Sequence, residues 1–275
     1  MGKGLTTAEQ PYTLKLSEAE LARYRTMAAV ALEAELDTWT EAGIRRGARV
    51  ADIGCGPAII LAELAQLVGP EGHVDGIDRD ADARATAEAY LHSREIVNAD
   101  IIAGEATNTG LAAGTYDTVM MRHVLLHNGP TMIAILKHLG TLLKPDGRLV
   151  LAEIDLEAMR TSPPSADLEE ERQAWLELLR RHGNDVMVGA HLASVVSEAG
   201  LEVVSFKGNL DVHWLRDVPD VRPAQVAARE AILAAGLATA EDAARWDAAW
   251  RAWQADPRDA YTCVSTFVAV ARPAN

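Results

Sequence analysis

The feature that most constrains the fold of this chain is a regular alternation of short apolar runs and helical segments between residues 45 and 156. The apolar runs have the length and composition of buried strands, and segments with apolar residues at helical spacing separate most of them. Strands that alternate with helices form parallel sheets with helices on both faces. We therefore predict a doubly wound α/β fold. The runs lie at 48–54, 72–80, 96–105, 116–124 and 147–155.

The chain on either side of this region has a different pattern. Residues 17–39 predict a long leading helix, and apolar strands are predicted at 201–208 and 260–272. We expect the last strand to pair antiparallel with the strand at 201–208, which completes a seven-stranded, mostly parallel, Rossmann-like sheet. The domain organisation that we predict is a helical lid over residues 1–44, then one domain over 45–275 with helical cap insertions at about 160–187 and 219–257.

Two glycines after the first predicted strand require an explanation, because glycine adds nothing to a core and costs conformational entropy. Gly54 and Gly56 flank Cys55 in the stretch VADIGCGPA. In open α/β sheets, ligands bind beyond the carboxyl ends of the strands, next to the first strand-to-helix turn. Asp78 ends the next predicted strand, 22 residues beyond Gly56. A carboxylate at that distance suits the hydroxyls of a ribose, so the pattern predicts a site for a nucleoside-containing cofactor.

The ordered motifs resemble those of the class I S-adenosylmethionine-dependent methyltransferases, whose first motif is an acid followed by two spaced glycines. Asp52, Gly54 and Gly56 match this motif, and Ala58 replaces a third glycine that is often present. The leading segment and the cap resemble, more loosely, small-molecule methyltransferases of bacterial secondary metabolism, which implies a natural-product intermediate as acceptor. The resemblance covers roughly residues 45–156 and continues through Asp78, AGEA at 103–106, YDTVMMRHVLLHN at 116–128 and LLKPDGRLVLAE at 142–153.

The resemblance implies S-adenosylmethionine as the cofactor and gives each motif a part of it to bind. The backbone at Gly54 and Gly56 would lie against the methionine moiety, and Asp52 would hold the ammonium group directly or through water. Asp78 would bind the ribose, and Arg79 beside it belongs to the same set of cofactor-binding residues.

Three further segments complete the implied cofactor site. Glu105 would pair with the adenine amino group, although the family more often has the shorter Asp here, and the backbone N–H of Ala106 would meet a ring nitrogen. Arg122 would lie under the cofactor and contribute its backbone carbonyl. Tyr24 on the leading helix would contact the cofactor carboxylate or face the sulfonium, with ordinary helix packing as the alternative.

Two histidines are the candidate catalytic bases. His123 and His127 are four residues apart, and we expect them on one face of a helical turn near the transferred methyl group. His127 is the better candidate, because the matching family position often lines the acceptor pocket. Packing or substrate shaping is the alternative role, since methyl transfer from a sulfonium can rely on proximity and orientation alone. The pair has no carboxylate in helical register, so we expect no metal site.

Charge and composition limit the partners. The formal net charge of −14 argues against nucleic acid, which is bound by clustered Lys and Arg. Together with the helical segments predicted after Asp155, which could roof a pocket, it predicts a small, largely apolar acceptor. No apolar run approaches the roughly 20 residues that span a membrane. The two cysteines provide no disulfide framework, so we expect a cytoplasmic protein. Trp246, Trp250 and Trp253 fall on one helix face, where packing in the core or in a homodimer is expected over substrate contact.

Two alternative functions remain open at this point. An NAD-dependent oxidoreductase would share the glycine turn and Asp78, but it would have a third glycine where Ile59 stands. A cofactor-binding protein of the same fold that transfers no methyl group would carry identical binding motifs.

Overall fold

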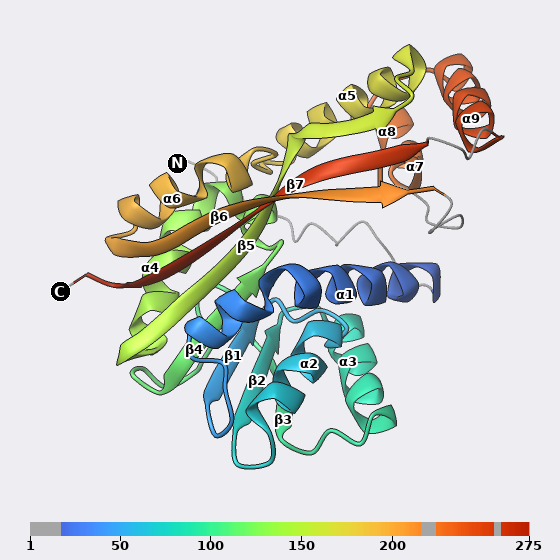
Figure 1. Ribbon diagram of the computed structural model, residues 1–275. Coiled ribbons are helices and arrows are strands. Elements are labelled where there is room, and N and C mark those ends of the chain that lie inside the picture. The colour runs from blue at the N-terminus through green and yellow to red at the C-terminus, as the bar shows by residue number, and fades with distance from the viewer. Residues whose placement is uncertain (1–17, 216–223, 256–259, 275) are drawn as a thin grey trace, which may run out of the picture.

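The computed structural model describes residues 18–215, 224–255 and 260–274, so residues 1–17 of the predicted lid lie outside the described residues. Seven strands form one mixed sheet in the order β3-β2-β1-β4-β5-β7-β6 (Figure 1). β1 to β5 are parallel, whereas β7 runs antiparallel to both β5 and β6. The predicted seven-stranded α/β fold with an antiparallel last strand is therefore confirmed.

The elements follow the predicted alternation along the chain. The strands are β1 (Arg49–Ile53), β2 (His73–Asp78), β3 (Ala99–Ala103), β4 (Tyr116–Arg122), β5 (Leu143–Ser162), β6 (Leu201–Trp214) and β7 (Tyr261–Pro273). The helices are α1 (Glu18–Glu41), α2 (Ile59–Val68), α3 (Ala81–Ser93), α4 (Met132–Leu142), α5 (Ala166–Arg181), α6 (Val188–Glu198), α7 (Ala224–Ala227), α8 (Arg229–Ala234) and α9 (Ala240–Ala255), with a 3-10 helix, η1 (Leu125–Thr131), between β4 and α4.

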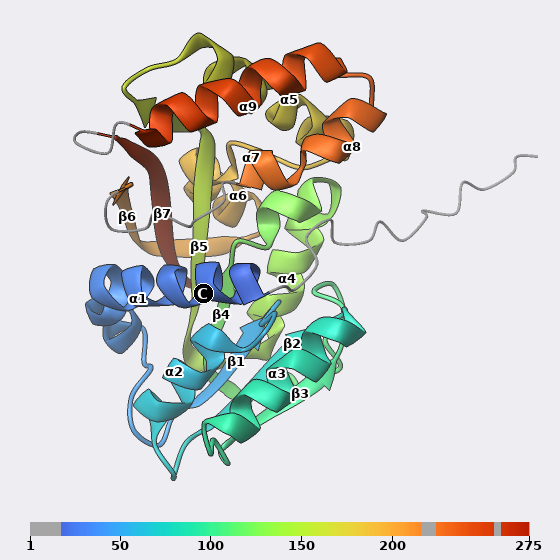
Figure 2. The same cartoon turned by 90° about the vertical axis from the view of Figure 1, so that its right-hand side faces the viewer.

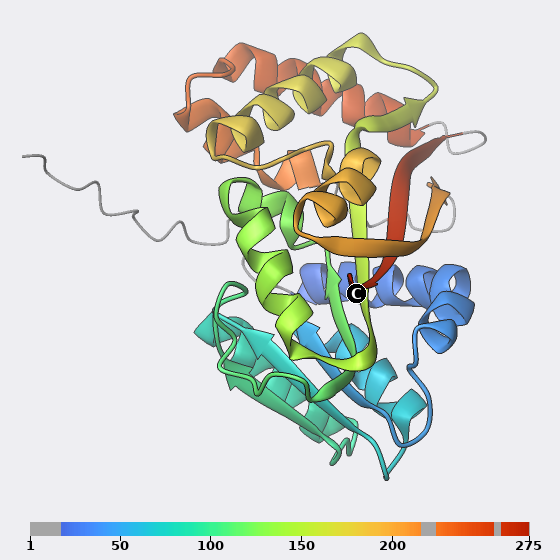
Figure 3. The same ribbon diagram turned by 90° about the vertical axis from the view of Figure 1, so that its left-hand side faces the viewer.

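Helices cover both faces of the sheet and bury an apolar core on each side. Successive side chains of a strand point to opposite faces. Along β5, Leu149 and Leu151 join the core under α4 and α6, whereas Val150 and Ala152 join the core under α1 and α2. Figure 3 shows α4 and α6 on the face opposite α1. Because both faces are buried, the strands read as nearly continuous apolar runs.

β5 is longer than the sequence pattern predicted. β5 continues past Asp155 to Ser162. This carboxyl-terminal part of the strand pairs with β7, and the last pair is Ser162 with Tyr261. β6 pairs with the other edge of β7 as far as Trp214. These three strands project beyond the parallel sheet toward helices α5, α7, α8 and α9 (Figure 1).

Helices from the two segments predicted as cap insertions pack together in one layer. α5 and α9 lie side by side across the top of the molecule (Figure 2). All three tryptophans of α9 are at most 8% exposed, and Trp250 Nε1 donates to the buried carboxylate of Glu171 on α5. The packing role predicted for this tryptophan stripe is therefore confirmed. Within the described part of the chain, no helix combines the length and apolar character needed to cross a membrane.

Candidate functional site

The chain turns sharply from β1 into α2 at the carboxyl edge of the sheet. Gly54 and Gly56 have φ angles of 76° and 52°, a region that favours glycine. A Cβ on Gly54 would lie 2.4 Å from Cγ2 of Val124, so this glycine lets the turn pack against the loop after β4. A Cβ added to Gly56 would have no atom of another residue within 4 Å, apart from its chain neighbours. The turn therefore exposes backbone at Gly56, where a ligand can approach it closely.

The carboxylate of Asp78 at the end of β2 holds this turn. Its Oδ2 accepts a hydrogen bond from the Gly56 N–H at 2.9 Å, and its Oδ1 accepts one from the Asp80 N–H at 2.9 Å. Each carboxylate oxygen has capacity for a second hydrogen bond. Asp78 thus organises the glycine turn and keeps acceptor capacity for the two hydroxyls of a ribose.

The ends of β2 and β3 bring the next predicted residues together. The guanidinium of Arg79 lies 4.0 Å from the carboxylate of Glu105, and both side chains are more than half exposed. Ala106 is half-buried and packs against the core under α4. The segment predicted to meet adenine is therefore next to the segment predicted to meet the ribose.

The guanidinium of Arg122 lies at the centre of a buried charge network. It forms an ion pair with Glu35 of α1 and lies 5.8 Å from the ring centroid of Trp39, whose Nε1 also donates to Glu35 at 3.0 Å. The sequence analysis assigned Arg122 only a backbone role, whereas its side chain anchors α1 to the end of β4. Burial raises the pKa of Asp52 to about 7, with the positive charge of Arg122 opposing the shift.

The amino-terminal half of α1 approaches the loop after β4. Tyr24 is half-buried there, and the guanidinium of Arg23 lies 5.0 Å from the centroid of its ring. Burial lowers the pKa of His123 to about 3, and the positive charges of Arg122 and Arg23 add to the shift. The positive charge of Arg23 on α1 therefore acts on the loop after β4.

The two candidate bases do not share a helical turn, so that prediction is wrong. His123 has a φ of 55°, and η1 begins only at Leu125. The side chain of His123 is half-buried, with a buried Nδ1 that has no hydrogen-bond partner in the described part of the chain. Its pKa of about 3 leaves the ring neutral over the physiological range, but it makes His123 a weak base.

His127 has the geometry of the better base. His127 is exposed as a residue, although its imidazole is partly desolvated, and Nδ1 lies 3.1 Å from Oδ1 of Asn184. Because an amide oxygen only accepts hydrogen bonds, Nδ1 carries the proton and Nε2 is the basic atom. Desolvation lowers the pKa of His127 below its ordinary value, with the hydrogen bond to Asn184 opposing the shift. The ring is therefore neutral at pH 7.

Glu153 near the middle of β5 is a residue of this region that the sequence analysis did not single out. It is fully buried, and Oε1 accepts hydrogen bonds from the N–H groups of Val124 and Leu125 at 2.9 and 2.7 Å. These two bonds satisfy the N–H groups at the amino end of η1. The helix therefore begins after His123. Oε2 of Glu153 is buried and without a partner among the described residues, and burial raises the pKa of Glu153 to about 7. The sequence does contain a signal for this residue, because Glu153 is an acid within the otherwise apolar run 149–154.

Replacing Glu153 with Gln changes how stability depends on pH. The pKa of Glu153 is raised from 4.5 to about 7 on folding, so between these values the folded protein keeps a proton that the unfolded chain loses. Glu153 therefore costs stability as pH rises, whereas Gln does not titrate. We expect the variant to gain up to about 3 kcal/mol relative to wild type between pH 4.5 and pH 8 in urea unfolding. The exposed control Glu88→Gln should show no such trend, and a constant difference for Glu153→Gln would contradict the expectation.

Comparisons with known proteins identify the family and the fold of this chain. A model of the methyltransferase domain matches residues 22–206. A demethylmenaquinone methyltransferase from Geobacillus sp. is 31% identical over 117 residues, which are 42% of this chain and 50% of that protein. An uncharacterised 37.1 kDa protein encoded in a Streptomyces fradiae transposon is 29% identical over 196 residues, which are 71% of this chain and 52% of that protein. This chain thus spans about half the length of these two relatives.

Solved structures of low sequence identity share the fold. The crystal structure of a SAM dependent methyltransferase from Aquifex aeolicus superposes with a TM-score of 0.54 at 19% identity, covering 70% of this chain and 92% of that chain. Because the methyltransferase domain model covers residues 22–206 of a chain of 275 residues, more than half of it, this chain belongs to the methyltransferase domain family.

Proposed function

We propose that this chain binds S-adenosylmethionine across the carboxyl ends of β1, β2 and β3 and transfers its methyl group to a small, largely apolar acceptor. The observation that carries the proposal is the open left-handed turn at Gly56, held 2.9 Å from the Asp78 carboxylate. In the proposed complex with S-adenosylmethionine, Asp78 binds the ribose, and the paired side chains of Arg79 and Glu105 flank the adenine. The raised pKa of Asp52 fits a buried carboxyl group that becomes ionised beside the ammonium of the bound cofactor.

The acceptor is proposed from the charge of the chain and from its relatives. A net charge of −14 is unfavourable for a phosphate backbone, and the α5 and α9 layer stands beyond the carboxyl ends of the strands, where ligands of such sheets bind. Relatives named demethylmenaquinone methyltransferases act, by that name, on a small molecule. We propose a natural-product intermediate of similar size, from which the neutral Nε2 of His127 removes a proton.

Calorimetry with three ligands tests the cofactor. We expect S-adenosylmethionine and S-adenosylhomocysteine to bind one per chain and NAD to bind at least about 100-fold more weakly, a difference of about 2.7 kcal/mol. Mass spectrometry should then detect S-adenosylhomocysteine when a panel of small apolar acceptors is added. A preference for NAD would contradict the proposal, and cofactor binding with no turnover on any acceptor would favour a binding protein that transfers no methyl group.

A further inference from the structure

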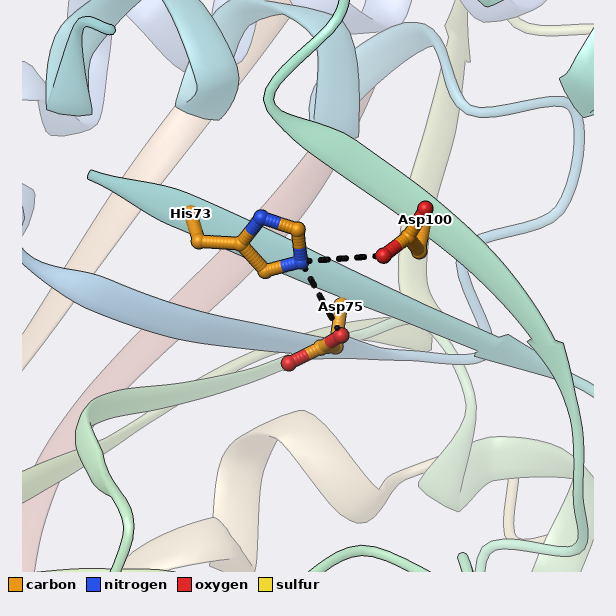
Figure 4. A group of neighbouring side chains, drawn as sticks. All are labelled: His73, Asp75 and Asp100. Atoms are coloured by element: carbon orange, nitrogen blue, oxygen red, sulfur yellow. Dashed lines mark hydrogen bonds and ion pairs between the residues drawn. The ribbon is translucent and has the colours of Figure 1, made fainter. Parts of the chain in front are cut away.

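A second cluster of polar side chains lies near the amino ends of β2 and β3, far along the strands from the glycine turn. His73 and Asp75 are two residues apart on β2, so their side chains share a face of the sheet. Asp100 on β3 stands directly opposite Asp75 in the parallel register. Figure 4 shows the imidazole of His73 beside both carboxylates. The expectation of no metal site concerned only the pair His123 and His127. The register of β2 and β3 that brings His73, Asp75 and Asp100 together is not visible in local sequence.

The distances within this cluster suit ligands that share one cation. Nε2 of His73 lies 3.2 Å from Oδ1 of Asp75 and 3.3 Å from Oδ2 of Asp100. The contact of 3.2 Å is a long hydrogen bond, and the contact of 3.3 Å lies just beyond the usual range. Zn²⁺ binds His nitrogen and carboxylate oxygen at about 2.0–2.2 Å, and two ligands of a tetrahedral ion are then about 3.3 Å apart. The separations are therefore those between neighbouring ligands of a small divalent ion.

The surroundings of Asp75 orient it toward that position. Arg49 and the hydroxyl of Tyr116 both donate to Oδ2, at 2.9 and 2.8 Å, which leaves Oδ1 directed at His73. Carboxylates that bind metals are commonly held by hydrogen bonds of this kind. Asp75 is 5% exposed, whereas His73 and Asp100 are 32% and 71% exposed, so water has access to the open side of the cluster.

The pairing of two carboxylates across β2 and β3 also favours a cation. Like charges directly opposite each other on neighbouring strands destabilise a sheet. Arg49 compensates Asp75 from the Oδ2 side, but Oδ1 of Asp75 and Oδ2 of Asp100 converge on His73. A divalent ion between these oxygens removes the repulsion and uses the imidazole as a third ligand.

We propose that His73, Asp75 and Asp100 bind a divalent transition-metal ion such as Zn²⁺, with water completing its coordination. One imidazole and two carboxylates form a donor set that such ions accept. The ion cross-links β2 and β3 at the amino ends of these strands. Asp78 lies at the other end of β2, so the metal is far along the strand from the proposed cofactor site. The role of the ion is therefore to stabilise the sheet.

Titration calorimetry with Zn²⁺ tests this site independently of the methyltransferase activity. The protein is first treated with EDTA and transferred to buffer without chelator. We expect one ion per chain in wild type, with affinity at least tenfold lower in His73→Ala and in Asp100→Asn. Two exposed residues outside the cluster supply matched controls, His92→Ala and Glu71→Gln, which should bind as wild type does. Zn²⁺ should also raise the Tm of wild type and of both controls, because it binds the folded state.

These variants should keep the fold, so a loss of binding reports on the site. Asp100 is mostly exposed, so Asp100→Asn should keep the fold, which circular dichroism checks. Asp75 is left unchanged because it also holds Arg49 and Tyr116. No saturable binding up to about 1 mM Zn²⁺ would overturn the proposal and leave the cluster as a network of ion pairs. Equal binding by wild type and His73→Ala would place the ion elsewhere and would overturn it as well.

Discussion

We expect His127→Ala to lower kcat at least about 100-fold while leaving the affinity for S-adenosylmethionine unchanged. General base catalysis contributes typically 10²–10⁴-fold, and Nδ1 of His127 pairs with Asn184, so Nε2 is the proposed basic atom. Because desolvation lowers the pKa of His127, the wild-type rate should stay constant to below pH 6.5, the ordinary value for this side chain. Steady-state kinetics from pH 5 to 9, with cofactor calorimetry, measure both effects.

Three further variants separate base catalysis from its alternatives. Asn184→Ala removes the hydrogen bond that selects the tautomer, so we expect a smaller loss of kcat than in His127→Ala. His92→Ala, an exposed histidine on α3, should behave as wild type. His123→Ala should lose less activity than His127→Ala, because a pKa of about 3 makes His123 a weak base. Losses below about fivefold in both His123→Ala and His127→Ala would mean that the reaction relies on orientation alone.

We expect Asp78→Ala to weaken the binding of S-adenosylmethionine by about 1.5–3 kcal/mol, which is about 10- to 150-fold in Kd. The carboxylate would lose its hydrogen bonds to the ribose hydroxyls. It would also release the N–H of Gly56, which it holds at 2.9 Å, so the backbone facing the cofactor would be less well ordered. Calorimetry at constant pH and salt measures the loss.

Two variants control for indirect effects on the cofactor site. Asp78→Asn keeps one acceptor oxygen and removes the charge, so its Kd should lie between those of wild type and Asp78→Ala. Asp82→Ala removes an exposed acid from the first turn of the neighbouring helix α3 and should change Kd less than about twofold. A change below about threefold for Asp78→Ala, with the fold retained, would contradict a ribose contact at this position.

Local sequence signals predict the order of the elements and the position of the glycine turn after β1. Both depend on local signals: apolar runs that are buried on both faces, helical spacing between them, and glycines that alone adopt the left-handed turn at Gly54 and Gly56 without strain. The resemblance of these motifs to methyltransferases is confirmed by the match of the family model over residues 22–206. The roles of His127, Asp78 and Glu105 stay predictions.

Which charged groups meet in the interior depends on contacts between residues far apart in the chain. Glu35 and Arg122 are 87 residues apart, and Glu153 caps a helix that begins 28 residues earlier in the chain. His73, Asp75 and Asp100 come together only through the parallel register of β2 and β3. A charged side chain in a local sequence window does not reveal whether a distant partner will compensate its burial. Packing across the sheet determines which charged side chains are buried, because a buried charge is tolerated only where the fold supplies a counter-charge or hydrogen bonds.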